Sequence, residues 1–478
     1  MVFCMQKTRL HKQIFNLGAC LYWILVSANI YAVDIFDMDA IRDASTLEVK
    51  VLQPWRTVPG LVSTRQLLIT INVGQIWSGQ DYRIPVRMVV PANRKAHGFH
   101  LTGSNTPARL MHPARPAGAN LELLKGGVGL VMTVVQEPGS YGLAELGRES
   151  EMRFARSLDP RHKIQYWAWP ATLMRAVTAA YSEKEYISSG KIAVSGSSKN
   201  GASPSMAIIH DQRMTALHAA VSPIWDSPLR LCDTKTWERH IAEGGRQGGF
   251  SGGHFGPNFN QRALDAGHTW KELQKFTRDI SDQVFISRNL KALKERKVDL
   301  LFHPGTHDMV AYDIAWGGAN YPTIPIYLAA NSGHGKKGHP ETERDQQNKT
   351  IWLLQHFFPE AFSMPMLSPP VVSTELTEKT LQVTVRFPKN LTEESGQIWW
   401  LYNRAPDGSP QYLQKLIPDD QTKQMTRSGN GIWNTEIVLD SAATRIDIFT
   451  NHRKTFSYRG RAYRTYISSP YTRIYLTK

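Results

Sequence analysis

One short stretch restricts the fold of this 478-residue chain more than any other. An apolar, strand-like run at residues 191–195 leads directly into the pattern Gly-x-Ser-x-x-Gly, which extends from Gly196 to Gly201. Small residues on both sides of a serine allow a strand to turn sharply into a helix and expose the serine hydroxyl. The usual pattern, Gly-x-Ser-x-Gly, has its second glycine one residue earlier. Counting from Gly196 identifies the exposed serine as Ser198, with Ser197 as the alternative.

Apolar strands alternate with stretches of helical spacing on both sides of this turn. Strands are expected at residues 98–102, 127–135, 191–195, 218–222, 298–303 and 324–330, with a helix at 167–181. Buried apolar strands separated by helices are typical of a mostly parallel sheet that carries helices on both faces. Two earlier runs, residues 66–74 and 82–90, alternate as antiparallel strands do. The predicted fold class is therefore α/β, with an α/β-hydrolase arrangement of the sheet.

Two later loops carry the residues that a serine nucleophile needs. Asp308 follows the strand expected at 298–303, and His334 follows the strand expected at 324–330. In α/β-hydrolases the catalytic residues follow one another along the chain in the order serine, acid, histidine. Without these partners, a glycine–serine turn could have a purely structural role. Ser198 would attack, His334 would act as base and then as acid, and Asp308 would orient the imidazole. The same loops offer His307 and Asp313 as alternative acid-position residues and His339 as an alternative base.

The loops around this serine also contain candidates for transition-state and substrate contacts. An oxyanion site needs a second N–H from the loop after an earlier strand, and Ser104 lies in such a loop. Lys199 either adds a positive charge beside the oxyanion or points into solvent. Trp225 and Asp226 follow the strand expected at 218–222, where α/β-hydrolases often line the acyl pocket. For Trp225, packing in the core is the alternative interpretation.

Several segments support a resemblance to a known family. They are residues 102–105, 135–138, 169–177, 196–201, 211–213 and 223–226, in this order. Over about residues 60–360 the chain resembles the PhoPQ-activated pathogenicity-related protein family, which consists of exported α/β-hydrolase-like proteins. The serine turn is also similar to the Gly-Cys-Ser-Arg-Asn-Gly element of glucuronoyl esterases. There the basic residue after the serine helps form the oxyanion site, which implies the same role for Lys199. The chain departs from the family at Asn200, where arginine is usual, and at Pro204, which would kink the following helix or mark its start.

The first residues have the features of a secretory signal peptide. Three basic residues precede an apolar run at residues 21–26, and cleavage fits after Ala28 or after Ala32. The apolar run is shorter than the roughly 20 residues that a membrane span needs, so we expect cleavage rather than a retained anchor. The protein is therefore expected to be exported, to a periplasm or to the outside, and to keep no membrane span after cleavage.

Composition excludes several other classes. With 41% hydrophobic and 20% charged residues the chain is globular rather than disordered. Its formal net charge of +15 is spread along the chain without a lysine–arginine block or nucleic-acid motif, so no nucleic-acid partner is expected. Only Cys232 lies outside the predicted signal peptide, which excludes an internal disulfide or a cysteine metal site in the mature protein. The histidines at 240, 254 and 268 are too widely spaced to predict a metal, and no cofactor is expected.

The predicted organisation has three parts. Residues 1–32 are the signal peptide, residues 33–363 the α/β-hydrolase domain, and residues 364–478 a β-sandwich of short alternating strands. Within the second part, residues 233–297 interrupt the strand–helix order with a glycine-rich stretch and polar helical sequence. This insertion is either a lid over the sheet's carboxyl edge or a surface excursion.

The sequence thus predicts an exported serine hydrolase. Carboxylic esters are the favoured substrates, as small molecules or on carbohydrates, and a neighbouring cation would suit acidic sugars. A serine peptidase on the same fold is one alternative, because the same triad performs both reactions. A catalytically silent, envelope-associated binding protein is the other. The oligomeric state does not follow from the sequence.

Overall fold

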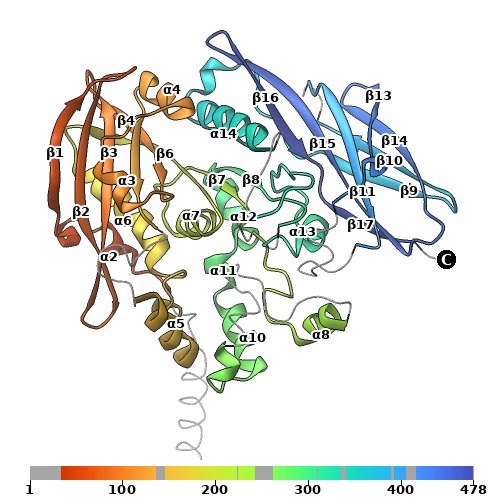
Figure 1. Ribbon diagram of the computed structural model, residues 1–478, viewed down its shortest axis with the longest axis horizontal. Helices are drawn as coiled ribbons and strands as arrows, with labels where there is room; N and C mark the ends of the chain where they lie inside the picture. The colour runs from red at the N-terminus through yellow and green to blue at the C-terminus, as the bar shows by residue number, and fades with distance from the viewer. Residues whose placement is uncertain are drawn as a thin grey trace, which may run out of the picture. The chain divides into compact units, whose positions relative to one another are not determined.

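A mixed sheet with the strand order β1-β2-β3-β5-β4-β6-β7-β8 organises the first two thirds of the chain in this computed structural model (Figure 1). The structure describes residues 34–135, 146–222, 224–242, 262–308, 310–334, 341–388, 392–404 and 416–476. The strands of this sheet are β1 (Lys50–Val58), β2 (Thr64–Trp77), β3 (Gln80–Pro91), β4 (Ala96–Thr102), β5 (Gly129–Thr133), β6 (Ile187–Ser197), β7 (Ala216–Ala220) and β8 (Asp299–His303).

The direction of the strands identifies the fold. The pairs β1–β2, β2–β3 and β3–β5 are antiparallel, whereas β5, β4, β6, β7 and β8 run parallel to one another. The chain therefore has the α/β-hydrolase fold, in which the strand before the nucleophile lies near the middle of the parallel part. The predicted α/β class is confirmed, and the strands expected from β2 to β8 are all present.

The stretch expected as a strand at 324–330 is less regular than predicted. It forms isolated parallel bridges from Ile326 to Phe302 and from Ala329 to Gly305 instead of a continuous ladder. One reason is that Pro325 has no N–H to donate. Another is that Ser468 of the C-terminal region bonds this stretch from its other side, donating its N–H to the Ile326 carbonyl at 2.8 Å.

Helices cover both faces of the sheet (Figure 1). α6, which spans Ala168–Ser182, packs on β2, β3, β5 and β6, and α7, which spans Lys199–His210, packs on β6 and β7. The opposite face is covered by α4 (Gly118–Gly126) and α14 (Glu341–Phe357), which also contact each other. The structure also has the α-helices α2 (Met38–Arg42), α3 (Pro107–Met111), α5 (Leu146–Ser157), α8 (Thr234–Ala242), α10 (Trp270–Asp279), α11 (Ser281–Val284), α12 (Ile286–Glu295) and α13 (Ile314–Asn320).

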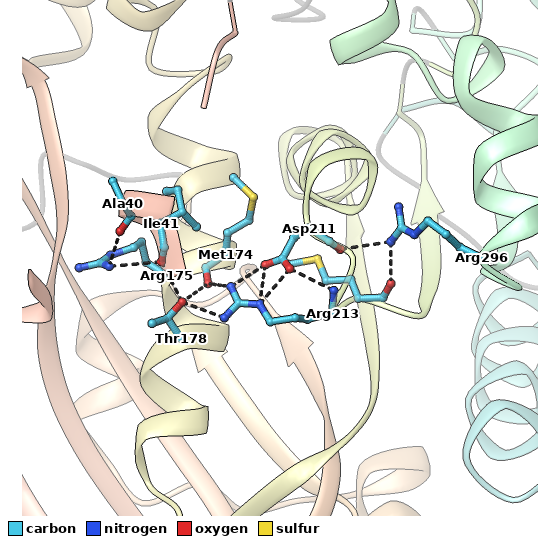
Figure 2. Close-up of polar contacts among 9 residues, drawn as sticks. Ala40, Ile41, Met174, Arg175, Thr178, Asp211, Arg213 and Arg296 are labelled. Atoms are coloured by element: carbon cyan, nitrogen blue, oxygen red, sulfur yellow. Dashed lines mark hydrogen bonds and ion pairs between the residues drawn. The ribbon is translucent and has the colours of Figure 1, made fainter. Parts of the chain in front are cut away.

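Arginine side chains hold the far end of α7 in place. Arg296 donates to the backbone carbonyls of Asp211 and Met214 (Figure 2) and also to that of Ile208. A cation therefore lies at the helix C-terminus, where the helix dipole favours it. Arg213 forms two short bonds to the carboxylate of Asp211, and it also donates to the Met174 carbonyl of α6. These bonds fix α7, the helix that follows the candidate nucleophile, against α6.

The C-terminal strands form two antiparallel sheets. One has the order β13-β14-β10-β9, and the other has the order β12-β11-β15-β16 with β17 also paired to β15. The strands are β9 (Val371–Leu376), β10 (Thr380–Arg386), β11 (Ser395–Tyr402), β12 (Thr422–Gln424), β13 (Thr426–Gly429), β14 (Ile432–Val438), β15 (Arg445–Tyr458), β16 (Arg461–Ser468) and β17 (Thr472–Tyr475). Along β10 and β14 buried side chains alternate with more exposed ones, as in a sheet that packs on one face, and the predicted sandwich is confirmed.

Two apolar clusters join the sandwich to the α/β part. Leu381 and Ile448, on the facing sides of the two sheets, belong to a cluster that also contains Leu354 of α14. The opposite side of β11 and β15 contributes Trp399 and Phe449, whose rings stack at 5.3 Å, to the cluster of the α/β sheet. The sheet with β11 and β15 is thus buried on both faces. Ile35–Lys478 forms a single compact unit, and the predicted boundary at residues 363–364 stays a prediction.

Some predicted features lie outside the described residues. These are the signal peptide, residues 136–138 of the family-like segments, the glycine-rich stretch of the insertion, His254 and His339. The described part of the insertion is mostly helical and includes α8, α10, α11 and α12. Within the described ranges, no helix is both long enough and apolar enough to cross a membrane.

A buried histidine connects the two strands that lead into the candidate site. His100 of β4 lies with Nε2 2.7 Å from the Ser195 hydroxyl of β6, and its Nδ1 lies 2.8 Å from Oδ1 of Asn120. Desolvation, and to a lesser degree the positive charge of Lys349, lower the pKa of His100 to about 3, although the Asn120 bond opposes the shift. His100 is therefore neutral in the folded protein throughout the physiological range.

We predict that His100 makes the fold acid-sensitive. The unfolded chain binds a proton on this residue below about pH 6.5, whereas the folded protein does not until about pH 3, so stability falls as pH falls through this window. On going from pH 6.5 to pH 5 the free energy of unfolding should therefore fall in both proteins, and the fall should be about 2 kcal/mol smaller in His100→Gln than in the wild type. Denaturant unfolding of both proteins at the two pH values tests this, and equal losses would contradict it.

Candidate active site

Ser198 occupies a strained turn between β6 and α7. Its backbone has φ 58° and ψ −125°, a combination outside the regions open to residues with a Cβ. β6 ends at Ser197 and α7 begins at Lys199, so Ser198 is the single residue of the turn. Such strain persists only where the surrounding structure enforces it, and it is common at functional sites.

The two glycines of the motif explain how the turn closes. A Cβ on Gly196 would overlap the backbone carbonyl of Asn200, which passes directly over this position. A Cβ on Gly201 would lie 3.0 Å from the carbonyl oxygen of Ala220 on β7. The second glycine thus allows α7 to pack closely on β7, although it comes one residue later in the motif than usual. Ser198, as counted from Gly196, is the residue that forms the turn.

The structure brings Ser198, His334 and Asp308 together. The Ser198 Oγ lies 2.6 Å from Nε2 of His334, and Nδ1 of the same imidazole lies 2.9 Å from Oδ1 of Asp308. Asp308 is fully buried, whereas His334 and Ser198 are partly exposed. These distances are those of a nucleophile, a base and an orienting acid. Ser197 is exposed at the end of β6.

The alternatives for the acid make other contacts. Asp313 forms an ion pair with the buried Arg230, whose Nε and Nη2 donate to its two oxygens at 2.7 and 3.0 Å. His307 is buried, with Nδ1 2.8 Å from the Thr306 hydroxyl. Arg230 also donates to the carbonyl of Val310, and the Val310 N–H in turn donates to Oδ1 of Asp308 at 2.9 Å. The Arg230–Asp313 pair therefore holds the loop that carries Asp308, a supporting contact that spacing alone did not reveal.

The candidate oxyanion donors lie at the same edge of the sheet. Lys199 is the first residue of α7, where backbone N–H groups are free of helix partners and the helix dipole favours negative charge. Its Nζ lies 5.9 Å from the centre of the Trp169 ring. Ser104 follows β4, the neighbour of β6, and is bridged to Val134.

Asn105, next to Ser104, has a structural role that the sequence analysis missed. Its Nδ2 donates to the carbonyls of Thr133 at 3.0 Å and Thr102 at 3.3 Å, which ties the ends of β5 and β4 together. The asparagine directly after Gly103-Ser104 was the available signal, because asparagine side chains commonly bond backbone groups in turns.

Trp225 and Asp226 are both buried. The indole of Trp225 packs against Gly317 of α13, where any larger residue would overlap the ring. Asp226 accepts a hydrogen bond from the Ser287 hydroxyl at 2.7 Å and pairs with Arg288 at 2.5 Å, which anchors the start of α12. Both side chains thus have packing or anchoring contacts, and their role toward a substrate stays a prediction.

Candidate metal ligands are dispersed. Among the residues that the structure describes, no group of three or more His, Cys, Asp or Glu side chains could hold a metal ion. His240 packs edge-on against Trp237, and Nε2 of His268 lies 3.1 Å from the carbonyl oxygen of Arg156.

Comparisons with known proteins identify similar folds only. No protein-family model and no curated protein sequence matches the chain, so membership of the PhoPQ-activated family stays a prediction. Acetyl xylan esterase 1 from Thermoanaerobacterium sp. JW/SL YS485 is 12% identical with a TM-score of 0.42, and the match covers 67% of this chain and 94% of that chain.

Two further solved structures are similar to a comparable extent. A glucuronoyl esterase from Solibacter usitatus is 13% identical with a TM-score of 0.38, and 65% of this chain and 86% of that chain are covered. An S-formylglutathione hydrolase from Agrobacterium tumefaciens is 10% identical, again with a TM-score of 0.38, and the covered shares are 64% and 98%. At these identities and TM-scores the likeness concerns the fold alone.

We predict that the strain at Ser198 costs stability. Glycine adopts positive φ freely, whereas alanine does not, and neither variant keeps the hydroxyl. Ser198→Gly should therefore be more stable than Ser198→Ala by about 1 kcal/mol, after the extra chain entropy of glycine is subtracted from the relieved strain. Denaturant unfolding of the two variants measures the difference. An alanine variant as stable as the glycine variant would contradict the prediction, because the strain would then be no larger than the entropic cost of glycine, about 0.5–1 kcal/mol.

Proposed function

We propose that this protein is a serine hydrolase that acts through an acyl-enzyme. The single observation that supports this most strongly is the continuous chain of contacts from Ser198 through His334 to Asp308, at 2.6 and 2.9 Å. In the proposed reaction the Ser198 Oγ attacks the substrate's carbonyl carbon while Nε2 of His334 accepts its proton. In this proposal the backbone N–H groups at the start of α7 and near Ser104 stabilise the negative charge that develops on the carbonyl oxygen.

The second half of the cycle follows from the same groups. When the tetrahedral intermediate collapses, the protonated His334 donates its proton to the leaving oxygen, and the alcohol departs. Water then attacks the acyl group with His334 again as base, which releases the carboxylic acid and restores the Ser198 hydroxyl. Asp308 keeps the imidazole in one tautomer and offsets its positive charge during both steps.

Carboxylic esters are the proposed substrates, with esters of carbohydrates as the favoured class. The argument is the resemblance of the turn around Ser198 to that of glucuronoyl esterases, together with the cation at Lys199. A peptidase is the alternative within the same chemistry. Export and cleavage of residues 1–32 are part of the proposal, because the signal-peptide features of the sequence support them.

We predict that a fluorophosphonate probe labels the purified protein. An activated serine displaces fluoride from such a probe and keeps the phosphonyl group, whereas an ordinary serine reacts negligibly. Ser198→Ala should abolish labelling, and the matched variant Ser197→Ala should label at close to the wild-type rate. Asp308→Asn should slow the reaction by orders of magnitude, since it removes the orienting carboxylate; this change costs about 10⁴-fold in a well-studied triad.

The same experiment separates the rival functions. A catalytically silent binding protein would show no labelling in the wild type, and this outcome would contradict the proposal. Equal labelling of the wild type and Ser198→Ala would show that another residue is the nucleophile. Probe labelling does not separate an esterase from a peptidase, so turnover of ester and peptide substrates is measured as well, and turnover of peptides without turnover of esters would favour the peptidase.

We also predict what the Lys199 side chain contributes. If its charge stabilises the oxyanion, Lys199→Met should lower kcat on neutral and acidic sugar esters alike, by about 10- to 100-fold. If it instead recognises an acidic sugar, only the acidic ester should be affected, and mainly through KM. Steady-state kinetics on a matched pair of esters distinguishes these. Unchanged kinetics on both would show that Lys199 is solvated and uninvolved.

A further inference from the structure

Thr306, two residues before Asp308, joins three separate segments of the chain. Its N–H donates to the Ala329 carbonyl at 3.0 Å, and its hydroxyl accepts a bond from the Asn331 N–H at 2.8 Å. Its carbonyl accepts a bond from Nη2 of Arg404 at 3.0 Å. The first two bonds join the loop of the candidate acid to the loop of the candidate base. The third comes from the C-terminal region, 98 residues further along the chain.

Arg404 is itself held in a buried polar chain. It follows β11, and its Nη1 donates to the hydroxyl of Tyr471. Tyr471 donates to Oδ2 of Asp447 at 2.8 Å, and Asp447 is fully buried on β15. The Arg404 side chain is buried too, so its direction is fixed by these bonds rather than by solvent. A buried hydrogen-bonded arginine of this kind is a rigid support for the carbonyl that it contacts.

The loop of the candidate base is supported by the same region. Asn331, three residues before His334, has φ 56°. Its Oδ1 accepts a bond from the Ile417 N–H at 2.8 Å, and its Nδ2 donates to the Ile417 carbonyl at 3.4 Å. Ile417 is buried in the cluster that also contains Trp399 and Phe449. Both loops of the candidate triad are thus bonded by residues from the C-terminal part of the chain.

We propose that the C-terminal sheets form part of the catalytic framework, and that Arg404 is a positioning residue for Asp308 and His334. This inference rests on the proposed function of the triad. Without the guanidinium, the buried Thr306 carbonyl would lose a charge-assisted partner, and the joined loops could shift. A shift of about 1 Å in a catalytic group can cost about 100-fold in rate.

The chain offers a matched control for Arg404. Arg473 binds the same Asp447 carboxylate, with Nε and Nη2 each at 2.7 Å from its oxygens, and it is partly exposed. Arg404→Met and Arg473→Met therefore both remove an arginine from one network, and only the first removes the contact to the acid loop. Asn331→Gly provides a second test, because glycine keeps the positive φ and removes the bonds to Ile417.

The experiment measures fluorophosphonate labelling of the full protein together with its thermal unfolding. Arg404→Met should lower the maximal labelling rate by about 10- to 100-fold with little change in the half-saturating probe concentration. Arg404→Lys should recover part of the rate, since its ammonium is still able to reach the carbonyl. Asn331→Gly should slow labelling as well, whereas Arg473→Met should label like the wild type even if its melting temperature falls.

Each other outcome overturns the inference. Equal slowing in Arg404→Met and Arg473→Met would show a general structural effect, and wild-type labelling in folded Arg404→Met would show that the contact is dispensable. If Arg404→Met does not fold, Asn331→Gly decides: wild-type labelling in that variant would reject the proposed support. A wild type that does not label would instead contradict the proposed function, and this inference with it.

Discussion

The single strained residue at the end of β6 determines how the rest of this site is arranged. Ser198 has positive φ because Gly196 lets the Asn200 carbonyl pass over the strand end and Gly201 lets α7 approach β7. With any larger residue at Gly196 the turn could not close in this form. The turn presents the Ser198 hydroxyl at the carboxyl edge of the sheet and at the N-terminus of α7. The bonds of Arg296 and Arg213 hold the other end of this helix, so the whole segment is fixed at both ends.

The partners of Ser198 depend on parts of the chain far from the turn. The loops that carry Asp308 and His334 are joined through Thr306 and are also bonded from the C-terminal sheets. The sheet with β11 and β15 is buried on both faces, which gives those bonds a rigid base. The geometry of the candidate triad is therefore a property of the entire described unit rather than of the α/β sheet alone.

The sequence predicted the features that depend on local pattern. Alternating apolar runs indicated the strands, and the glycine spacing indicated Ser198 as the residue of the turn. Strand-end position pointed to Asp308 and His334, which lie in contact with each other and with Ser198, while their catalytic roles stay a proposal. It did not predict the support from Arg404, because a hydrogen bond across 98 residues leaves no periodic signal. It left the place of Pro204 open, and the structure has this proline inside α7. It also overestimated the regularity of residues 324–330, where bonds to Ser468 replace part of the ladder.

The central claim is that strain and contact with His334 make Ser198 the reactive residue, not merely a serine in a turn. Mass-spectrometric localisation of a phosphonate adduct on the wild-type protein tests this most directly. Trypsin releases residues 192–199 as one peptide, which contains Ser195, Ser197 and Ser198. The account predicts one adduct per chain, on Ser198 alone, because Ser195 is bonded to His100 and Ser197 lies on the strand. An adduct on either neighbour, or on a serine elsewhere in the chain, would contradict it.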